Sequence, residues 1–79
     1  MSNQTRPLWE IAEDIYATWP NPYFGARPYL EAMSDLNSIE EQYGLDSARS
    51  IVRYFLSNAN TYRGPDARRI KAELQSLVK

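Results

Sequence analysis

The chain has 79 residues and a formal net charge of −1, and it contains neither cysteine nor histidine. These absences exclude disulfides and metal sites built on thiolate or imidazole, and they remove the commonest general base of enzymes. The small net charge hides an asymmetry: residues 1–43 carry two basic and seven acidic side chains (−5), whereas residues 44–79 carry seven basic and three acidic ones (+4). Either the two halves face each other in the fold, or one half faces a charged partner.

From this length we expect a single domain, spanning residues 1–79, with a small core and modest stability. Met1–Glu10 lacks the apolar segment of a signal peptide. The longest uncharged run, Ile15–Ala26, is interrupted by two prolines and a glycine and cannot span a bilayer. We therefore expect a protein of the cytoplasm that makes no membrane contact.

A first helix is predicted over residues 7–18. Pro7 suits the first helical position, where a missing N–H costs nothing. An apolar stripe follows at intervals of three and four residues, made by Leu8, Ile11, Ala12, Ile15 and Trp19. The next segment, WPNPYFGARP at 19–28, holds three prolines and a glycine, so no helix is expected to cross it.

A second helix is predicted over residues 28–43, opened by Pro28 and closed by Gly44 as its C-terminal cap. Its apolar face consists of Tyr29, Ala32, Met33, Leu36, Ile39 and Tyr43. Ser38 and Glu41 have the spacing of a capping box. The segment is therefore either one helix or two short helices that meet near Asn37.

A third helix is predicted over residues 46–59, with Asp46 as its N-cap, and a fourth over residues 65–78, opened by Pro65. The third has the cleanest apolar stripe of the chain, formed by Ala48, Ile51, Val52, Phe55, Leu56 and Ala59. We expect it to be the buried centre. No alternating β pattern occurs, so the predicted fold class is all-α, a small bundle of three to four helices around one core.

Two surfaces are candidates for binding a protein. The proline-rich linker displays Trp19, Tyr23 and Phe24, and aromatic side chains on a rigid loop are typical of protein-binding patches. The alternative is that the linker aromatics close one end of the core.

The second candidate surface is the face of the third helix that bears Arg49, Arg53 and Tyr54. Two arginines at i and i+4 repel each other mildly, so a partner elsewhere is expected. The alternative interpretation supplies that partner within the chain, from Glu40, Glu41 or the acids of the first helix.

A basic stripe near the C-terminus is a candidate for binding nucleic acid. The stripe is formed by Arg68, Lys71, Gln75 and Lys79, and the candidates at the start of the fourth helix are Arg63, Arg68, Arg69 and Lys71. A helix-turn-helix-like domain would contact phosphates from such a helix start. Arg69 has local acidic partners in Asp66 and Glu73. The alternative is a solvated helix face, and the acidic isoelectric point of about 5.3 counts against a dedicated nucleic-acid domain.

The sequence contains no motif typical of catalysis, phosphate binding or metal binding. There is no glycine-rich phosphate loop, no paired metal-ligand spacing and no nucleophile motif. Glu13 and Asp14 are adjacent, so on a helix they point in different directions and make a poor acid–base pair. We expect no catalytic residues, no cofactor and no metal.

Three stretches carry a resemblance to a known family: PYLEAM at 28–33, YGLDSARSIVRYFLSNANTYRG at 43–64 and ARRIKAEL at 67–74. They resemble a family of small uncharacterised proteins encoded by tailed bacteriophages that infect actinobacteria. The resemblance covers about two thirds of the chain and implies a phage accessory protein that acts in the bacterial cytoplasm. It carries over no functional residues.

Three hypotheses for function follow, in order of preference. The first is a non-enzymatic phage accessory protein that binds a host or phage protein. The second is a DNA-binding domain that uses the basic C-terminal helix. The third is a small structural component, in which a homo-oligomer completes the marginal core.

Overall fold

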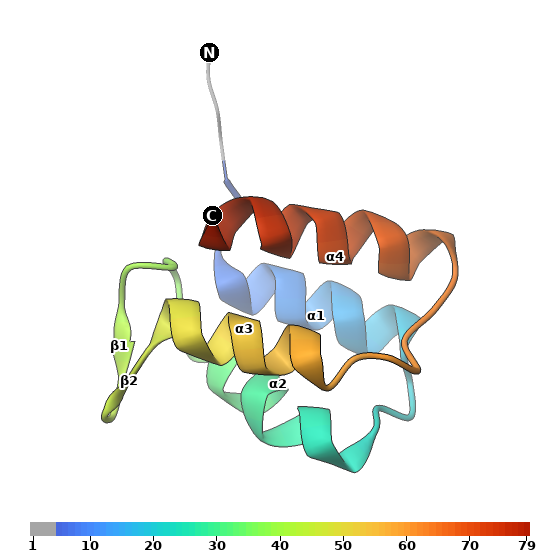
Figure 1. Cartoon of the computed structure of the whole chain (residues 1–79), viewed down its shortest axis with the longest axis horizontal. Helices are drawn as coiled ribbons and strands as arrows, with labels where there is room; N and C mark the ends of the chain where they lie inside the picture. The colour runs from blue at the N-terminus through green and yellow to red at the C-terminus, as the bar shows by residue number, and fades with distance from the viewer. Residues whose placement is uncertain (1–4) are drawn as a thin grey trace.

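The computed structural model describes residues 5–79, so the first four residues of the segment considered for a signal peptide lie outside it. Its elements are α1 (Leu8–Thr18), the 3₁₀ turn η1 (Phe24–Ala26), α2 (Arg27–Met33), the strands β1 (Gln42–Tyr43) and β2 (Asp46–Ser47), α3 (Ala48–Ser57) and α4 (Pro65–Val78) (Figure 1). α4 has the predicted bounds, with Pro65 in its first turn.

The four α-helices form a closed ring around one core. α1 packs against α2 and α4, and α3 also packs against α2 and α4. Most buried residues belong to the predicted apolar stripes, among them Leu8, Ile11, Ile15, Met33, Ile51, Val52 and Phe55, and α4 buries Ile70 and Leu74. In the predicted second helix, Leu30 is buried in place of Tyr29, which is half-buried, and Tyr43 is exposed. The predicted all-α bundle is thus confirmed.

Two aromatic side chains close the end of the core where α1 stops. Trp19 stacks on Tyr62, with ring centroids 4.9 Å apart and planes inclined by 11°, and its edge faces Phe55. The Tyr62 hydroxyl lies 2.6 Å from the Thr18 hydroxyl, which donates to the carbonyl of Asp14. For Trp19, the structure therefore matches the alternative in which the linker closes the core.

The second helix is much shorter than predicted, because α2 ends at Met33. The carbonyls of Leu36 and Asn37 accept hydrogen bonds from the amides of Trp9 and Leu8, at 2.9 and 3.0 Å. These bonds satisfy the first amides of α1, which have no partners within their own helix. A helix over 28–43 would direct the same carbonyls to its own amides instead, so the prediction of one helix was wrong. The alternative of a second short helix after Asn37 was also wrong, because the next element after α2 is the strand β1.

A small antiparallel hairpin stands where the end of that helix was expected. Tyr43 pairs with Asp46 across a two-residue turn, Gly44-Leu45. Gly44 has φ of 62°, and no residue other than glycine has positive φ within residues 5–79, which is the pattern of a type II′ turn. Gly44 is thus a turn residue and not a helix cap. The N-cap of α3 is Ser47, which accepts from the amide of Ser50, and not Asp46.

The charge asymmetry is resolved only in part within the fold. Asp14 of the acidic half pairs with Arg69 of the basic half at 3.2 Å. Arg6, a basic residue of the acidic half, pairs with Glu73, an acidic residue of the basic half, at 2.7 Å. Arg6 also contacts Asp14, so one network joins the N-terminal segment, α1 and α4. The remaining charges of both halves face outward or find other partners.

Candidate protein-binding surface

Tyr23 and Phe24 form an exposed aromatic pair on the linker between α1 and α2. Their ring centroids lie 4.8 Å apart, and their exposed fractions are 45% and 76%. The turn beneath them is fixed, because the amide of Ala26 donates to the Tyr23 carbonyl at 2.9 Å and the Arg27 side chain donates to the Pro22 carbonyl at 3.2 Å. The pair is therefore presented by ordered backbone.

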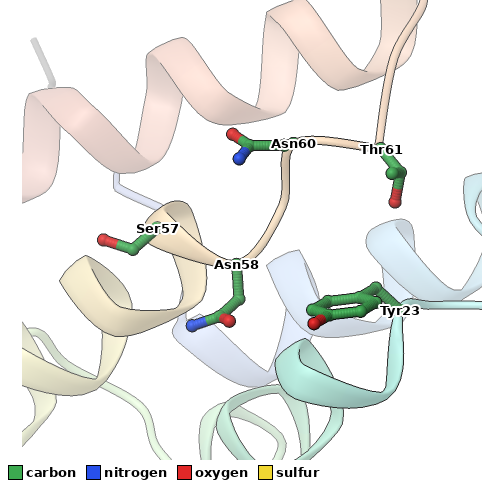
Figure 2. A pocket seen from close by; sticks show the side chains of 5 residues that line it. All are labelled: Tyr23, Ser57, Asn58, Asn60 and Thr61. Atoms are coloured by element: carbon green, nitrogen blue, oxygen red, sulfur yellow. The ribbon is translucent and has the colours of Figure 1, made fainter.

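A pocket of about 280 Å³ lies between Tyr23 and the segment that follows α3. Its other lining residues are Ser57, Asn58, Asn60 and Thr61. Figure 2 shows the Thr61 side chain pointing toward the Tyr23 ring, with Asn58 beside that ring and Asn60 turned away from it. One wall of the pocket is thus aromatic, and the facing wall is made of amide and hydroxyl groups.

Gly25 sets the position of the Tyr23 ring. A Cβ atom at residue 25 would lie 2.6 Å from the Tyr23 ring and 2.9 Å from the Asn58 side-chain oxygen. Both distances are shorter than ordinary Cβ contacts, so any other residue at position 25 would displace the Tyr23 ring or the Asn58 side chain from this arrangement.

The polar wall has both fixed and free groups. Ser57 donates to the Arg53 carbonyl and the Asn58 amide nitrogen donates to the Tyr54 carbonyl, so the last turn of α3 holds both side chains. Among the described residues, the side chains of Asn60 and Thr61 make no hydrogen bond. Their donors and acceptors are open to a bound chain.

Tyr54 extends this surface along α3, one helical turn before Asn58. It is 49% exposed, and its ring contacts the half-buried ring of Tyr29 on α2 with centroids 5.5 Å apart. We use the term aromatic surface for Tyr23, Phe24, Tyr54 and the pocket lining. Trp19 is buried and is not part of it.

Arg49 and Arg53 lie elsewhere, against the end of α4. α3 and α4 run antiparallel, which brings the start of α3 beside the last turn of α4 (Figure 1). Arg49 donates to the carbonyls of Leu77 and Lys79 at 3.3 and 3.5 Å, and Arg53 donates to that of Val78 at 3.2 Å. The expected acidic partners, Glu40, Glu41 or the acids of α1, were wrong, because the partners are helix-end carbonyls.

Three of the four basic candidates for nucleic-acid binding make contacts within the chain. Arg69 bonds to Asp14 and Asp66, and Lys71 lies 5.8 Å from the centre of the Tyr62 ring. Partial burial lowers the pKa of Lys71, and the nearby charge of Arg63 lowers it further. Arg63 donates to the Asn60 carbonyl. Arg68 is exposed and has no ion pair within residues 5–79.

Sequence reasoning missed the polar half of the pocket. The residues of this half are of types that are typical of turns, and nothing in their spacing indicates that they face Tyr23. They are Ser57, Asn58, Asn60 and Thr61. The one usable signal is Gly25, a glycine next to two aromatic residues.

Comparison of the chain with protein-family models, curated proteins and solved structures finds no match. No helix in the described part of the chain is long and apolar enough to cross a membrane. Within residues 5–79, no three acidic side chains gather as a group that could hold a metal ion. The aromatic surface is therefore the feature of the described chain that points to a function.

Proposed function

We propose that this chain is a non-enzymatic phage accessory protein that acts in the bacterial cytoplasm by binding a host or phage protein. The observation that carries the proposal is the exposure of Tyr23 and Phe24 on a fixed turn beside a pocket. The resemblance of residues 28–33, 43–64 and 67–74 to a phage family supports the origin.

Burial explains why this surface favours a protein partner. Covering one large apolar side chain contributes about 1.5–3 kcal/mol, and Phe24 leaves most of that contribution unrealised in the free chain. Tyr23 and Tyr54 add large rigid rings with polar tips, the residue type enriched in interfaces. The ring of Tyr23 loses little side-chain entropy on binding, because it is already packed on Gly25.

The pocket indicates the form of the bound segment. Free side chains at Asn60 and Thr61 can pair with peptide N–H and C=O groups, while the Tyr23 ring contacts an apolar side chain. An extended peptide with one apolar side chain fits both requirements.

Affinity capture with matched variants tests this proposal. The tagged chain and the variant Tyr23→Ala/Phe24→Ala are incubated with lysate of an actinobacterium, and circular dichroism checks that both are folded. We expect the variant to lose its captured protein. The control Trp9→Ala/Tyr16→Ala removes two aromatic side chains of 40% exposure from α1 and should retain it. Retention by the folded Tyr23/Phe24 variant would refute the proposal.

DNA binding is the second candidate function, and one observation favours it. Neither Arg63 nor Lys71 has an acidic partner in the described part of the chain, and the pKa of Lys71 is lowered by burial and, to a smaller extent, by the nearby charge of Arg63. Fluorescence anisotropy with a random duplex at about 50 and 200 mM salt separates the two functions, since phosphate contacts weaken steeply with salt. Binding that is lost on Arg68→Glu/Lys71→Glu would support DNA as the partner.

A further inference from the structure

The tip of the β1–β2 hairpin is the most exposed apolar group of the described chain. Leu45 is fully exposed, and Tyr43 beside it is 41% exposed. The type II′ turn requires glycine only at its first central position, so any polar residue would fit at position 45. A leucine there leaves a fully hydrated apolar side chain on a fixed turn, and covering it by a partner would remove apolar surface from water.

We call residues 34–47, the segment that carries this tip, the hairpin arm, and all of its charged side chains are acidic. Residues 34–47 include Asp35, Glu40, Glu41 and Asp46 and no lysine or arginine. None of these four acids forms an ion pair within residues 5–79. The arm therefore carries four carboxylates without an ion-pair partner in the described chain, and one of them, Asp46, directly follows Leu45.

The opposite end of the molecule has the complementary properties. Figure 1 shows the hairpin at one end of the longest axis and the connection between α3 and α4 at the other. That connection carries Arg63, followed in α4 by Arg68, both exposed and without an acidic partner in the described chain. It also forms the polar wall of the Tyr23 pocket.

The Tyr23 pocket has room for a leucine side chain. Its volume is about 280 Å³. For comparison, an apolar cavity of about 150 Å³ holds a benzene molecule, which has more carbon atoms than the side chain of leucine. The pocket thus offers both a ring to contact the apolar tip and neighbouring cations to face its acids.

We propose that copies of this chain associate head to tail, with the Leu45 hairpin of one copy seated in the Tyr23 pocket of the next. The acids of the hairpin arm then face Arg63 and Arg68 of the receiving copy. This inference rests on the proposed function, since it assigns a second copy as an occupant of the same aromatic surface.

The geometry fixes the type of assembly. The tip and the pocket are different surfaces, so the contact is heterologous, and an open chain of copies keeps one free tip and one free pocket at its two ends until a ring closes. The net charge of −1 gives little overall repulsion between copies. The contact is small and charged at its edge, so association rises with concentration and weakens with salt.

Sedimentation velocity of the full chain and three variants tests the assembly. Leu45→Ser blocks the tip, and Arg63→Glu/Arg68→Glu blocks the receiving end. Lys79→Glu is the control, since it reverses an exposed charge outside both surfaces. Circular dichroism first establishes that each variant is folded.

For the unmodified chain, we expect the average mass to rise above 9.2 kDa as its concentration approaches about 1 mM at low salt. The rise should be lost at about 500 mM salt. Each blocked variant alone should remain at the monomer mass, and Lys79→Glu should behave as the unmodified chain. An equimolar mixture of the two blocked variants should form a species of at most two chains, because it has one working tip and one working pocket.

Three results would overturn the inference: a constant monomer mass, association that survives Leu45→Ser, or blocked variants that fail to combine. A failure here is distinguishable from a failure of the proposed function. If the chain stays monomeric while Tyr23→Ala/Phe24→Ala still loses its captured protein, the protein-binding surface stands and only the second copy is excluded.

Discussion

The guanidinium group of Arg6 donates two hydrogen bonds to the carboxylate of Glu73, at 3.0 and 2.7 Å, across 67 residues of the chain. The same guanidinium donates to Asp14, which also accepts from Arg69. This network ties the segment before α1 to α4. It uses only a few of the charges that make the two halves of the sequence so different, and it leaves the acidic hairpin arm and Arg68 unpaired among the described residues.

Replacing Arg6 with lysine keeps the positive charge but removes the paired geometry. A lysine cannot make two parallel bonds to Glu73 while also reaching Asp14. We expect the free energy of unfolding to fall by about 0.5–1 kcal/mol, measured by urea denaturation. The control Arg68→Lys, at an exposed position, should change it by less; equal effects would contradict the role of the network.

Asp14 makes stability depend on pH. Hydrogen bonds from Arg69, then from Arg6, lower its pKa below the ordinary value of 3.8, and partial burial opposes them. A lowered pKa means that the contribution to stability is complete above the ordinary value and is lost as pH falls through the folded value. We expect the free energy of unfolding, measured by urea denaturation, to fall less between about pH 6 and pH 2.5 in Asp14→Asn than in the unmodified chain. In Glu13→Gln, at the exposed neighbouring position, the free energy of unfolding should fall as much as in the unmodified chain.

Tyr62→Phe should destabilise the closed end of the core. The variant keeps the ring that stacks on Trp19 but removes the hydroxyl that lies 2.6 Å from Thr18. Loss of one hydrogen bond at a buried position costs about 0.5–1.5 kcal/mol, to be measured by thermal or urea denaturation. Tyr16→Phe on the exposed side of α1 is the matched control and should cost less than about 0.5 kcal/mol. Equal losses in the two variants would show that the Thr18 bond contributes nothing.

Arg49 and Arg53 should hold the last turn of α4. Cations near a helix C-terminus stabilise its unpaired carbonyls. In Arg49→Ala/Arg53→Ala we expect hydrogen exchange at the amides of residues 76–78 to become about 2–5-fold faster, with the first turns of α4 unchanged. Arg68→Ala should leave these amides unaffected. Unchanged exchange in the double variant would return both arginines to the set of binding candidates.

The sequence predicts the helices whose boundaries carry strong local signals. Pro65 places the start of α4 correctly, because a proline is favoured at the first helical positions. The structure buries Ala67, Ile70 and Leu74 of this helix, which recur at three and four residues. The prediction of the second helix was wrong because of a contact with a distant part of the chain. Leu36 and Ile39 continue the helical period, yet the carbonyls near them serve the first turn of α1, and a local pattern does not contain that contact.

The candidate surface, too, could be predicted only where its signal is local in the sequence. The exposed pair at residues 23 and 24 is visible in the sequence as aromatics among prolines, but only packing separates it from Trp19, which stacks on Tyr62. The partners of Arg49 and Arg53 are backbone carbonyls, which every residue possesses and no sequence pattern marks. The pocket depends on the segment after α3 meeting Tyr23 over Gly25, which is again a contact between distant parts of the chain.

The most direct test of protein binding at the aromatic surface is site-specific photo-crosslinking in cells of an actinobacterium. A photo-reactive phenylalanine analogue replaces Phe24, and in a second variant replaces Tyr16 as an exposed aromatic control on α1. We expect a protein adduct from position 24 that is absent from position 16 and disappears when Tyr23 is also changed to alanine. Adducts of equal yield from both positions, or adducts from position 16 alone, would contradict the account.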